Sequence, residues 1–249
     1  MSVPAFPADP PFHGAGRVPV VTAEEMRAWD VRAVQDLGIP EPVLMESAGR
    51  AAAAVIHRLY PEGRVVCAEG SGNNGGDARV AARTLRAWGR NVALVRVGTR
   101  APDPGLLHGW EVDSIDVDRM EDAFRGAGVI VDGLLGTGAT GAPRGAYADA
   151  IAAMNAAGRP IVALDGPSGV DLTTGIAEGV AVRAEVTVTF GAPKRGLLRF
   201  PGRALAGRIL AVEVGFPPLA EDAASAQLLA PAWVHALLPA VPPDAHKGT

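Results

Sequence analysis

Short apolar runs rich in β-branched residues recur along the chain, and amphipathic stretches with helical periodicity lie between several of them. The apolar runs predict strands at 65–68, 92–97, 129–131, 161–164, 186–190 and 209–214. The helical stretches between them are 77–88, 119–125 and 146–157. Strands that alternate with helices build a parallel sheet with both faces covered. The pattern therefore predicts an α/β fold, a three-layer α/β/α sandwich with a mostly parallel central sheet.

Two further helices are expected before the first strand. Thr22 is a suitable N-cap and Glu25 stands at the capping-box position, ahead of an amphipathic stretch that continues to Leu37. The second helix is the Ala-rich segment 43–59, which follows Pro42, and proline is favoured in a first helical turn. Both helices are candidates for a homodimer face, although packing on their own sheet explains them equally well.

The chain divides into three expected parts. Residues 1–19 are rich in Pro and Gly without periodicity, which predicts a flexible arm. Residues 20–216 carry the strand and helix pattern and form the expected domain. Residues 217–249 read as a Pro-rich linker or tail, with one short helix candidate at 231–238.

Composition narrows the class of partner. The 249 residues are 48% hydrophobic and carry a formal net charge of -4, so nothing favours binding to nucleic acid or to an acidic membrane surface. We therefore expect a small-molecule substrate. No apolar run has the length of a membrane span and no signal peptide is recognisable, which predicts a cytoplasmic protein. The single cysteine, Cys67, lies in an apolar run and is expected in the core.

The first strand is followed by the Gly-rich sequence Gly70-Ser71-Gly72-Asn73-Asn74-Gly75-Gly76-Asp77. Glycines after a strand and before a helix expose main-chain N–H groups to a ligand, which is typical of nucleotide loops. The two carboxamides and the acid distinguish it from the G-x-G-x-x-G fingerprint. A purely structural interpretation remains open, with Asp77 as the N-cap of the next helix and the asparagines as turn residues.

Three more strand ends carry polar or Gly-rich motifs. Residues 132–141, Asp-Gly-Leu-Leu-Gly-Thr-Gly-Ala-Thr-Gly, can form a nest of N–H groups for a diphosphate, with Asp132 placed as a cation ligand or acceptor. Asp165 emerges from a buried strand into Asp-Gly-Pro-Ser-Gly, where burial suits a proton-transferring acid, although it could simply cap a tight turn. Lys194 follows the next strand and could meet phosphate, orient a catalytic acid or be solvated.

Several common chemistries are excluded by what the sequence lacks. It contains no P-loop, no Cys/His cluster for zinc and no G-x-S-x-G nucleophile elbow. A Rossmann dehydrogenase or methyltransferase is disfavoured, because no acid for a ribose follows the second strand, where Val97 leads into Gly98.

Taken together and in this order, the four strand-end motifs resemble the NAD(P)H-hydrate epimerase family over about Val21 to Phe216. The resemblance implies a Rossmann-like domain that interconverts the R and S forms of hydrated NADH or NADPH, as the first step in repairing these damaged cofactors. A non-catalytic nucleotide-binding or dimerising scaffold of the same fold is the alternative, and retention of Asp165 argues against it. An ADP- or ATP-dependent dehydratase is an implied partner, either fused or separate.

The resemblance also assigns site residues. Independently of the resemblance, the strand-end positions of Asp165 and Lys194 make Asp165 the expected catalytic acid/base, with Lys194 assisting its orientation or binding. A potassium ion is implied, and its expected ligands are Asn74, Asp132 and Ser168, since a hard cation prefers oxygen donors. The implied substrate contacts are Asp165 together with Asn73, Asn74, Gly75, Gly76, Asp77, Gly136, Thr137, Gly138, Ala139, Thr140, Gly141 and Ala142.

The sequence departs from the family pattern at two places. Ala78 and Arg79 stand where a glycine and an apolar residue are usual, and Gly166 replaces an aliphatic residue before Pro-Ser-Gly. Arg79 could contact a phosphate or point to solvent, which leaves the preference between NADH and NADPH hydrates open. The final residues 245–249, Ala-His-Lys-Gly-Thr, resemble the start of the dehydratase domain of bifunctional members, or are an unrelated polar tail.

Overall fold

The computed structural model describes residues 18–98, 104–217 and 224–229. Its main feature is a seven-stranded sheet in which every neighbouring pair is parallel, in the order β4-β3-β2-β5-β6-β7-β8. The strands are β2 (Val65–Glu69), β3 (Val92–Arg96), β4 (Asp113–Ile115), β5 (Val129–Gly133), β6 (Ile161–Leu164), β7 (Val186–Phe190) and β8 (Arg208–Val212). The predicted three-layer α/β fold is confirmed.

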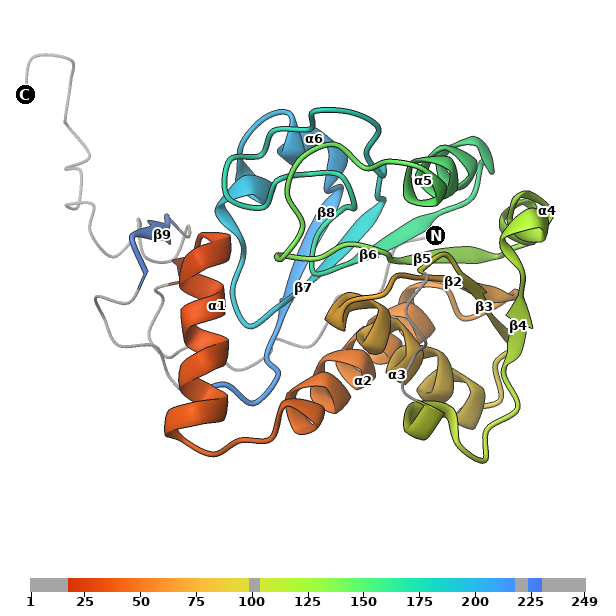
Figure 1. Cartoon of the computed structure of the whole chain (residues 1–249), viewed down its shortest axis with the longest axis horizontal. Helices are drawn as coiled ribbons and strands as arrows, with labels where there is room; N and C mark the ends of the chain where they lie inside the picture. Colours follow the sequence, from red (N-terminus) through yellow and green to blue (C-terminus); the bar gives the residue numbers. More distant parts are fainter. Residues whose placement is uncertain (1–17, 99–103, 218–223, 230–249) are drawn as a thin grey trace, which may run out of the picture.

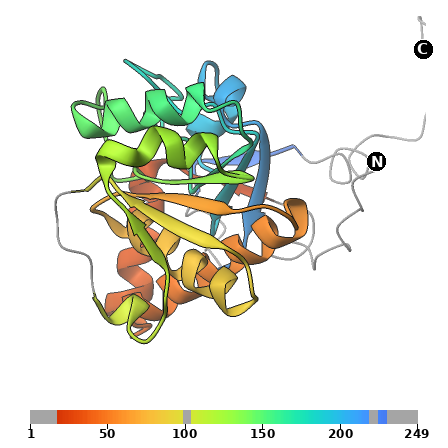
Figure 2. The same ribbon diagram turned by 90° about the vertical axis from the view of Figure 1, so that its right-hand side faces the viewer.

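Helices cover both faces of this sheet (Figures 1 and 2). One layer contains α2 (Glu41–Leu59) and α3 (Asn73–Ala87), whose apolar faces pack with alternate residues of the central strands. The other contains α4 (Met120–Arg125) and α5 (Ala146–Ala156), which pack on the opposite side chains of the same strands. Because β2, β5 and β6 are buried on both faces, they appear in the sequence as short apolar runs. Strand β7 is buried as well, but two of its five residues are the buried threonines Thr187 and Thr189.

The helix α1 (Ala23–Val31) begins as predicted, with a complete capping box. The Thr22 hydroxyl accepts from the Glu25 N–H at 3.1 Å, and the Glu25 carboxylate accepts from the Thr22 N–H at 2.7 Å. A short π-helical turn, η1 (Arg32–Asp36), follows it. Single-turn helices also occur at η2 (Pro104–Leu107), η3 (Val117–Arg119), η4 (Arg195–Leu198) and α6 (Gly202–Leu205).

The start of α3 differs from the prediction. The helix begins at Asn73 with Gly72 as its N-cap, so Asp77 lies in the second turn and is not the cap. The two glycines in the first turn are helical because their missing side chains permit close packing: a Cβ on Gly75 would lie 2.1 Å from the Gly70 carbonyl oxygen, and one on Gly76 would lie 2.6 Å from the Met45 sulfur. A Gly-rich sequence after a strand predicts a loop, so the helical conformation of these glycines is a difference from that prediction.

A second, two-stranded sheet was not predicted. Strand β1 (Val18–Val20) pairs antiparallel with β9 (Ala226–Leu228) and so joins the last residues of the expected arm to the expected tail. The Glu25 carboxylate accepts a hydrogen bond from the Ser225 N–H at 2.9 Å, which ties the same segment to α1. Short strands held by a distant partner leave no periodic signal of their own. The helix candidate at 231–238 and residues 245–249 lie outside the described residues.

The topology places a crevice at the carboxyl ends of β2 and β5. The chain runs outward from β2 to β3 and β4, then returns to the other side of β2 as β5, so the strand order reverses between these two neighbours. Ligands of open parallel sheets bind at such a switch point.

Candidate active site

A cleft of about 680 Å³ opens at the carboxyl ends of the central strands. One wall consists of α1, η1 and α2, which contribute mostly apolar side chains such as Met26, Val34 and Leu44. The other consists of the first two turns of α3 and the loops after β5, β6 and β7. The second wall contains nine of the predicted site residues, Asn73, Asn74, Asp77, Gly136, Thr137, Gly138, Ala139, Asp165 and Lys194.

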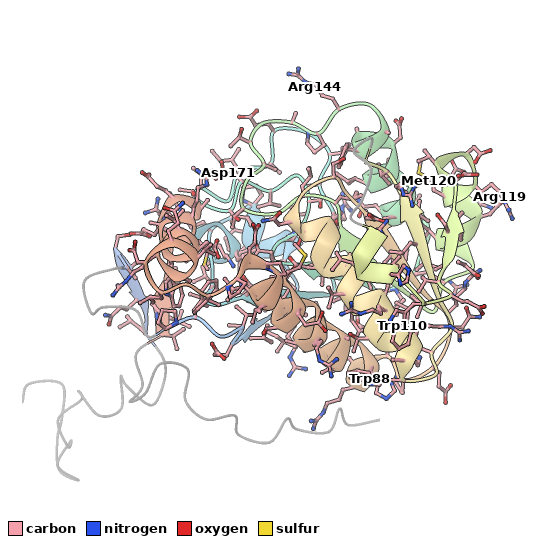
Figure 3. The ribbon with its side chains drawn as sticks, turned by 60° about the horizontal axis from the view of Figure 1, so that its bottom comes forward. Trp88, Trp110, Arg119, Met120, Arg144 and Asp171 are labelled. Carbon is pink, nitrogen blue, oxygen red and sulfur yellow. The ribbon has the colours of Figure 1, made fainter. Side chains whose placement is uncertain are left out.

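The remaining predicted residues lie behind or beside this cleft. Gly75 and Gly76 pack inside α3, as described above. Asp132 and Ser168 are fully buried beneath the loop that follows β5. Gly141 lines a smaller neighbouring cavity of about 160 Å³ with Gly136 and Ala139. The loop after β5 then continues to the surface, where Arg144 points away from the molecule (Figure 3).

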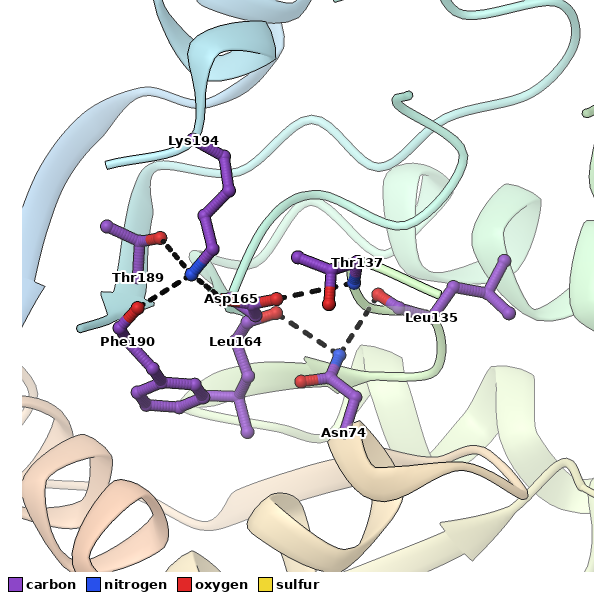
Figure 4. Close-up of polar contacts among 8 residues, drawn as sticks. All are labelled: Asn74, Leu135, Thr137, Leu164, Asp165, Thr189, Phe190 and Lys194. Carbon is purple, nitrogen blue, oxygen red and sulfur yellow. Dashed lines mark hydrogen bonds and ion pairs between the residues drawn. The ribbon is translucent and has the colours of Figure 1, made fainter. Parts of the chain in front are cut away.

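Lys194 is fully buried and directs its ammonium group at Asp165 (Figure 4). Its Nζ donates to Asp165 Oδ1, to Thr189 Oγ1 at 3.1 Å and to the Phe190 carbonyl at 2.7 Å. All three ammonium protons therefore have acceptors. The interpretation of Lys194 as a solvated loop residue is wrong, because β7 delivers it into the floor of the cleft.

The main chain holds Lys194 in place from the N-terminal side of the domain. Val21 donates its N–H to the Pro193 carbonyl at 3.0 Å, and its own carbonyl accepts from the Arg195 N–H at 2.7 Å. These two bonds form a parallel bridge on either side of the lysine. The segment before α1 thus helps to position a side chain far away in the sequence.

Asp165 adopts a left-handed backbone conformation at the end of β6, with φ of 64°, which is uncommon for a residue other than glycine. Its N–H donates to the Val188 carbonyl at 2.7 Å, so the neighbouring strand β7 supports the turn. The carboxylate meets Lys194 through Oδ1 and accepts from the Thr137 N–H through Oδ2 at 3.3 Å. The side chain therefore joins the strand-end loops and does not merely cap its own turn.

Asn74 reaches the same loops from the first turn of α3. Its Nδ2 donates to the Leu135 carbonyl at 3.0 Å and to the Leu164 carbonyl at 3.1 Å (Figure 4). Its Oδ1 is buried and has no hydrogen-bond partner among the described residues. A buried amide oxygen without a donor is costly, so this atom is suited to a ligand that supplies positive charge.

Asp132 and Ser168 form a compact polar pair below Leu135. The Ser168 hydroxyl and N–H donate to the two Asp132 carboxylate oxygens at 2.6 and 2.8 Å, and the Leu134 N–H adds a third bond at 3.2 Å. The Ser168 hydroxyl accepts from the Leu135 N–H at 2.9 Å. Since Asn74 contacts the carbonyl of the same Leu135, that residue joins all three predicted ion ligands into one cluster.

Three carboxyl groups in and beneath the cleft have a raised pKa, chiefly because burial disfavours the charged form. Burial raises the pKa of Asp132 to about 6 against the opposing hydrogen bonds from Ser168 and Leu134. The pKa of Asp77 lies well above its usual value, through burial and then the nearby charge of Asp165. The pKa of Asp30 is raised to about 6, again mainly by burial.

Asp30 is a half-buried acid of the cleft that the sequence analysis did not identify. It lies on α1, four residues after the buried Met26 and three before the buried Ala33, which places it on the inward side of the helix. This spacing is visible in the sequence and indicates that Asp30 lies on the inward side of α1. The sequence alone could not tell that this side of α1 faces the ends of the strands.

The departures from the family pattern have structural explanations. Arg79 is buried and pairs with Glu69, so both the phosphate-contact and the solvent interpretations are wrong. Gly166 makes room for Leu172, since a Cβ there would lie 2.3 Å from a Leu172 methyl carbon. Ala78 is fully buried against Gly133, the small residue opposite it on β5.

Comparison with known proteins identifies the family to which this chain belongs. The family model described as YjeF-related protein N-terminus matches residues 41–196. The chain belongs to this family. The crystal structure of yeast ynu0 superposes with a TM-score of 0.68 at 20% identity, covering 84% of this chain and 98% of the yeast chain, which supports the fold.

Among curated relatives, the protein named NAD(P)H-hydrate epimerase from Limosilactobacillus fermentum is 39% identical over 198 residues, which are 78% of this chain and 95% of that protein. The protein named bifunctional NAD(P)H-hydrate repair enzyme Nnr from Pyrobaculum aerophilum is 40% identical over 216 residues, or 81% of this chain. The match spans 42% of that relative's length. Within the described residues, no helix is both long and apolar enough for a membrane span.

Proposed function

We propose that this protein interconverts the R and S forms of hydrated NADH and NADPH. The observation that supports this most directly is the Asp165 carboxylate, fixed by the buried Lys194 in the floor of a cleft large enough for much of a nucleotide. The chain is also 39% identical to a protein named NAD(P)H-hydrate epimerase, and the match spans 95% of that protein. A merely dimerising scaffold would need neither the buried ion pair nor the cleft.

The reaction requires acid/base chemistry and no electron transfer. In the hydrated nicotinamide ring the hydroxyl is on a carbon bonded to the ring nitrogen, so protonating it lets the nitrogen lone pair expel water. The planar iminium that remains accepts water on its other face. Asp165 is our candidate for the proton-transferring group, with Lys194 and the Thr137 N–H fixing the orientation of its two oxygens.

The nucleotide portion of the substrate is proposed to bind along the second wall of the cleft. Asn73, at the N-terminus of α3, and the loop 136–139 line this wall, and both types of site favour phosphate groups. Gly138 has open space where a side chain would be, so a ligand can approach its backbone closely. The other motif residues, Gly75, Gly76, Thr140, Gly141 and Ala142, would act by shaping the backbone around the substrate.

We further propose that a potassium ion binds at Asn74, Asp132 and Ser168. These residues fit the ion, because the Asn74 Oδ1 lacks a donor and the cluster also contains the Leu135 and Leu164 carbonyl oxygens. When bound, the ion would supply positive charge next to the loops that carry the substrate. The three ligands come from α3, β5 and the loop after β6, so the ion would also hold these segments together.

A dehydratase is the proposed functional partner. An epimerase gives complete repair only when another enzyme consumes one of the two isomers. Relatives named bifunctional NAD(P)H-hydrate repair enzyme Nnr are matched over 41–46% of their length, which leaves room in those proteins for a second domain. Whether fused or separate, the partner would be an ADP- or ATP-dependent dehydratase.

The decisive experiment mixes the protein with racemic hydrated NADH and an S-specific dehydratase. The dehydratase alone should restore half of the NADH quickly and the remainder only at the spontaneous rate of epimerisation. Adding this protein should give rapid, complete conversion, measured by absorbance of the restored NADH. A persistent half would contradict the proposal and favour a non-catalytic role.

A further inference from the structure

We propose that Asp30 is a second catalytic acid/base, which serves the face of the nicotinamide ring opposite to Asp165. This inference rests on the proposed epimerase function. The hydroxyl leaves one face of the ring and returns to the other, so a ring that stays bound in one orientation needs a proton-transferring group on each face. A single carboxylate on one wall of the cleft cannot reach both.

The two groups belong to opposite walls of the same cleft. Asp165 comes from the loop after β6, whereas Asp30 comes from α1, which stands apart from the sheet in Figure 1. Asp30, Asp165 and Lys194 line the same cleft, and the charges of Asp165 and Lys194 both act on the Asp30 carboxyl group. A flat ring placed between the walls would present one face to each carboxyl group.

Asp30 is held in this position by the anchoring of α1. The adjacent Trp29 stacks on Phe216 with ring centroids 4.7 Å apart, and its indole N–H donates to the Pro217 carbonyl at 3.1 Å. At the start of the helix, the Ala23 N–H donates to the Thr173 hydroxyl at 2.9 Å. Both ends of α1 are therefore fixed, which gives Asp30 the rigid support that a catalytic group requires.

The environment of Asp30 suits proton transfer near neutral pH. Burial raises the pKa of its carboxyl to about 6, Lys194 opposes that rise, and Asp165 and Glu41 add to it. Within the described part of the chain, no hydrogen bond or ion pair engages the Asp30 carboxylate. A partly buried acid without a partner costs stability, and functional groups commonly carry such a cost.

Two other acids line the cleft, Glu41 and Asp77, and both are less suited to the second face. Glu41 is exposed and accepts a hydrogen bond from Asn73 Nδ2 at 2.7 Å. Asp77 lies on α3, whose first turn contacts the Leu164 carbonyl next to Asp165 through Asn74. Asp77 thus belongs to the wall that already carries Asp165.

The proposed cycle is balanced in protons. For the isomer whose hydroxyl faces α1, the Asp30 carboxylic acid protonates the hydroxyl, the C–O bond breaks, and water leaves as the nitrogen lone pair forms the iminium. A second water adds to the opposite face and gives its proton to the Asp165 carboxylate. The reverse sequence, with Asp165 as the acid and Asp30 as the base, converts the other isomer. Exchange with solvent resets the two protonation states.

The test measures oxygen exchange and inversion separately. Each purified isomer is incubated in ¹⁸O-labelled water with the wild type, Asp30→Asn or the control Glu24→Gln, an exposed acid on the same helix. Chiral chromatography with mass spectrometry then gives both rates. In Asp30→Asn, Asp165 can still expel and return the hydroxyl on its own face. We expect inversion to fall about 100-fold for both isomers, while the isomer whose hydroxyl faces Asp165 keeps its ¹⁸O exchange.

Matched variants complete the test. In Asp165→Asn, only the isomer whose hydroxyl faces Asp30 should keep its ¹⁸O exchange. The control Glu24→Gln should behave as the wild type. Asp30→Ala should lose inversion and regain part of it with added formate, which replaces the missing carboxyl group. Wild-type inversion by Asp30→Asn, or equal loss of exchange and inversion for both isomers, would overturn the assignment. A wild type that does not invert either isomer would instead overturn the proposed function.

Discussion

Arg79 and Glu69 form a two-pronged ion pair in the interior, with Nε–Oε1 and Nη2–Oε2 distances of 2.5 and 3.1 Å and both residues only 3% exposed. The pair joins the end of β2 to the second turn of α3, and so supports the helix that presents Asn74. Such a buried pair is strongly coupled, because removing one partner leaves the other charge buried and alone.

We therefore expect Arg79→Met to lower the free energy of unfolding by about 3–5 kcal/mol, measured by urea denaturation. The double variant Glu69→Met, Arg79→Met should recover most of this loss, because no charge then remains buried. Arg79 does not line the cleft, so the variant should keep the wild-type preference between NADH and NADPH hydrates. A changed preference would show that Arg79 influences the substrate after all.

The left-handed backbone at Asp165 decides which substitution tests its role. Asparagine tolerates this conformation, whereas alanine adds a strain of about 1 kcal/mol. Asp165→Asn keeps an acceptor for the Lys194 ammonium but removes its negative partner, so it should fold with reduced stability and lose epimerisation by a factor of about 10²–10⁴. Asp165→Ala removes the acceptor as well, so it should lose the same activity and still more stability. The two readouts are the coupled dehydratase assay and the melting temperature, and normal turnover by Asp165→Asn would exclude the catalytic role.

Potassium should stabilise the protein specifically. If the ion binds the folded state alone, a concentration ten times the dissociation constant adds about 1.4 kcal/mol. Potassium chloride should therefore raise the melting temperature more than tetramethylammonium chloride at the same ionic strength. Asn74→Ala and Ser168→Ala should remove this difference. An equal effect of the two salts on the wild type would argue against a specific site.

The raised pKa of Asp30 predicts a pH-dependent stability. Its folded-state value of about 6 exceeds its ordinary value of 3.8, so the folded state holds the proton more tightly. The resulting stabilisation is complete below about pH 4 and is lost as the pH rises through 6. Because Asp30 is only partly buried, solvent screening reduces this contribution to about 1–2 kcal/mol.

Asp30→Asn cannot lose this proton, so it should match the wild type at pH 4 and be more stable by that amount at pH 8, measured by chemical denaturation. The groups that face Asp30 remain unchanged in the variant, namely Lys194 and Asp165 across the cleft, Asp77 on α3 and Glu41 on α2. A pH-independent difference would contradict the explanation.

Local sequence signals predicted the main elements because their causes are local. The apolar runs of the buried parallel strands, the Thr22–Glu25 capping box and Pro42 in the first turn of α2 all appear in the structure close to their expected positions. Local signals misplaced the start of α3, because Gly75 and Gly76 are helical through their close contacts with Gly70 and Met45. They also missed β1, β4 and β9, which depend on pairing with distant segments.

The sequence by itself determined the alternation of strands and helices and the polar motifs that end the strands, and these already indicated the fold and the family. Parallel strands bring their carboxyl ends to one edge, so Asp165, Lys194 and Asn74 could be expected there together. Only the tertiary structure decided that Lys194 is buried against Asp165, that Arg79 pairs with Glu69, and that Asp30 faces the cleft. These relationships depend on how α1 and α3 pack against the sheet, and such contacts between distant segments leave no local pattern in the chain.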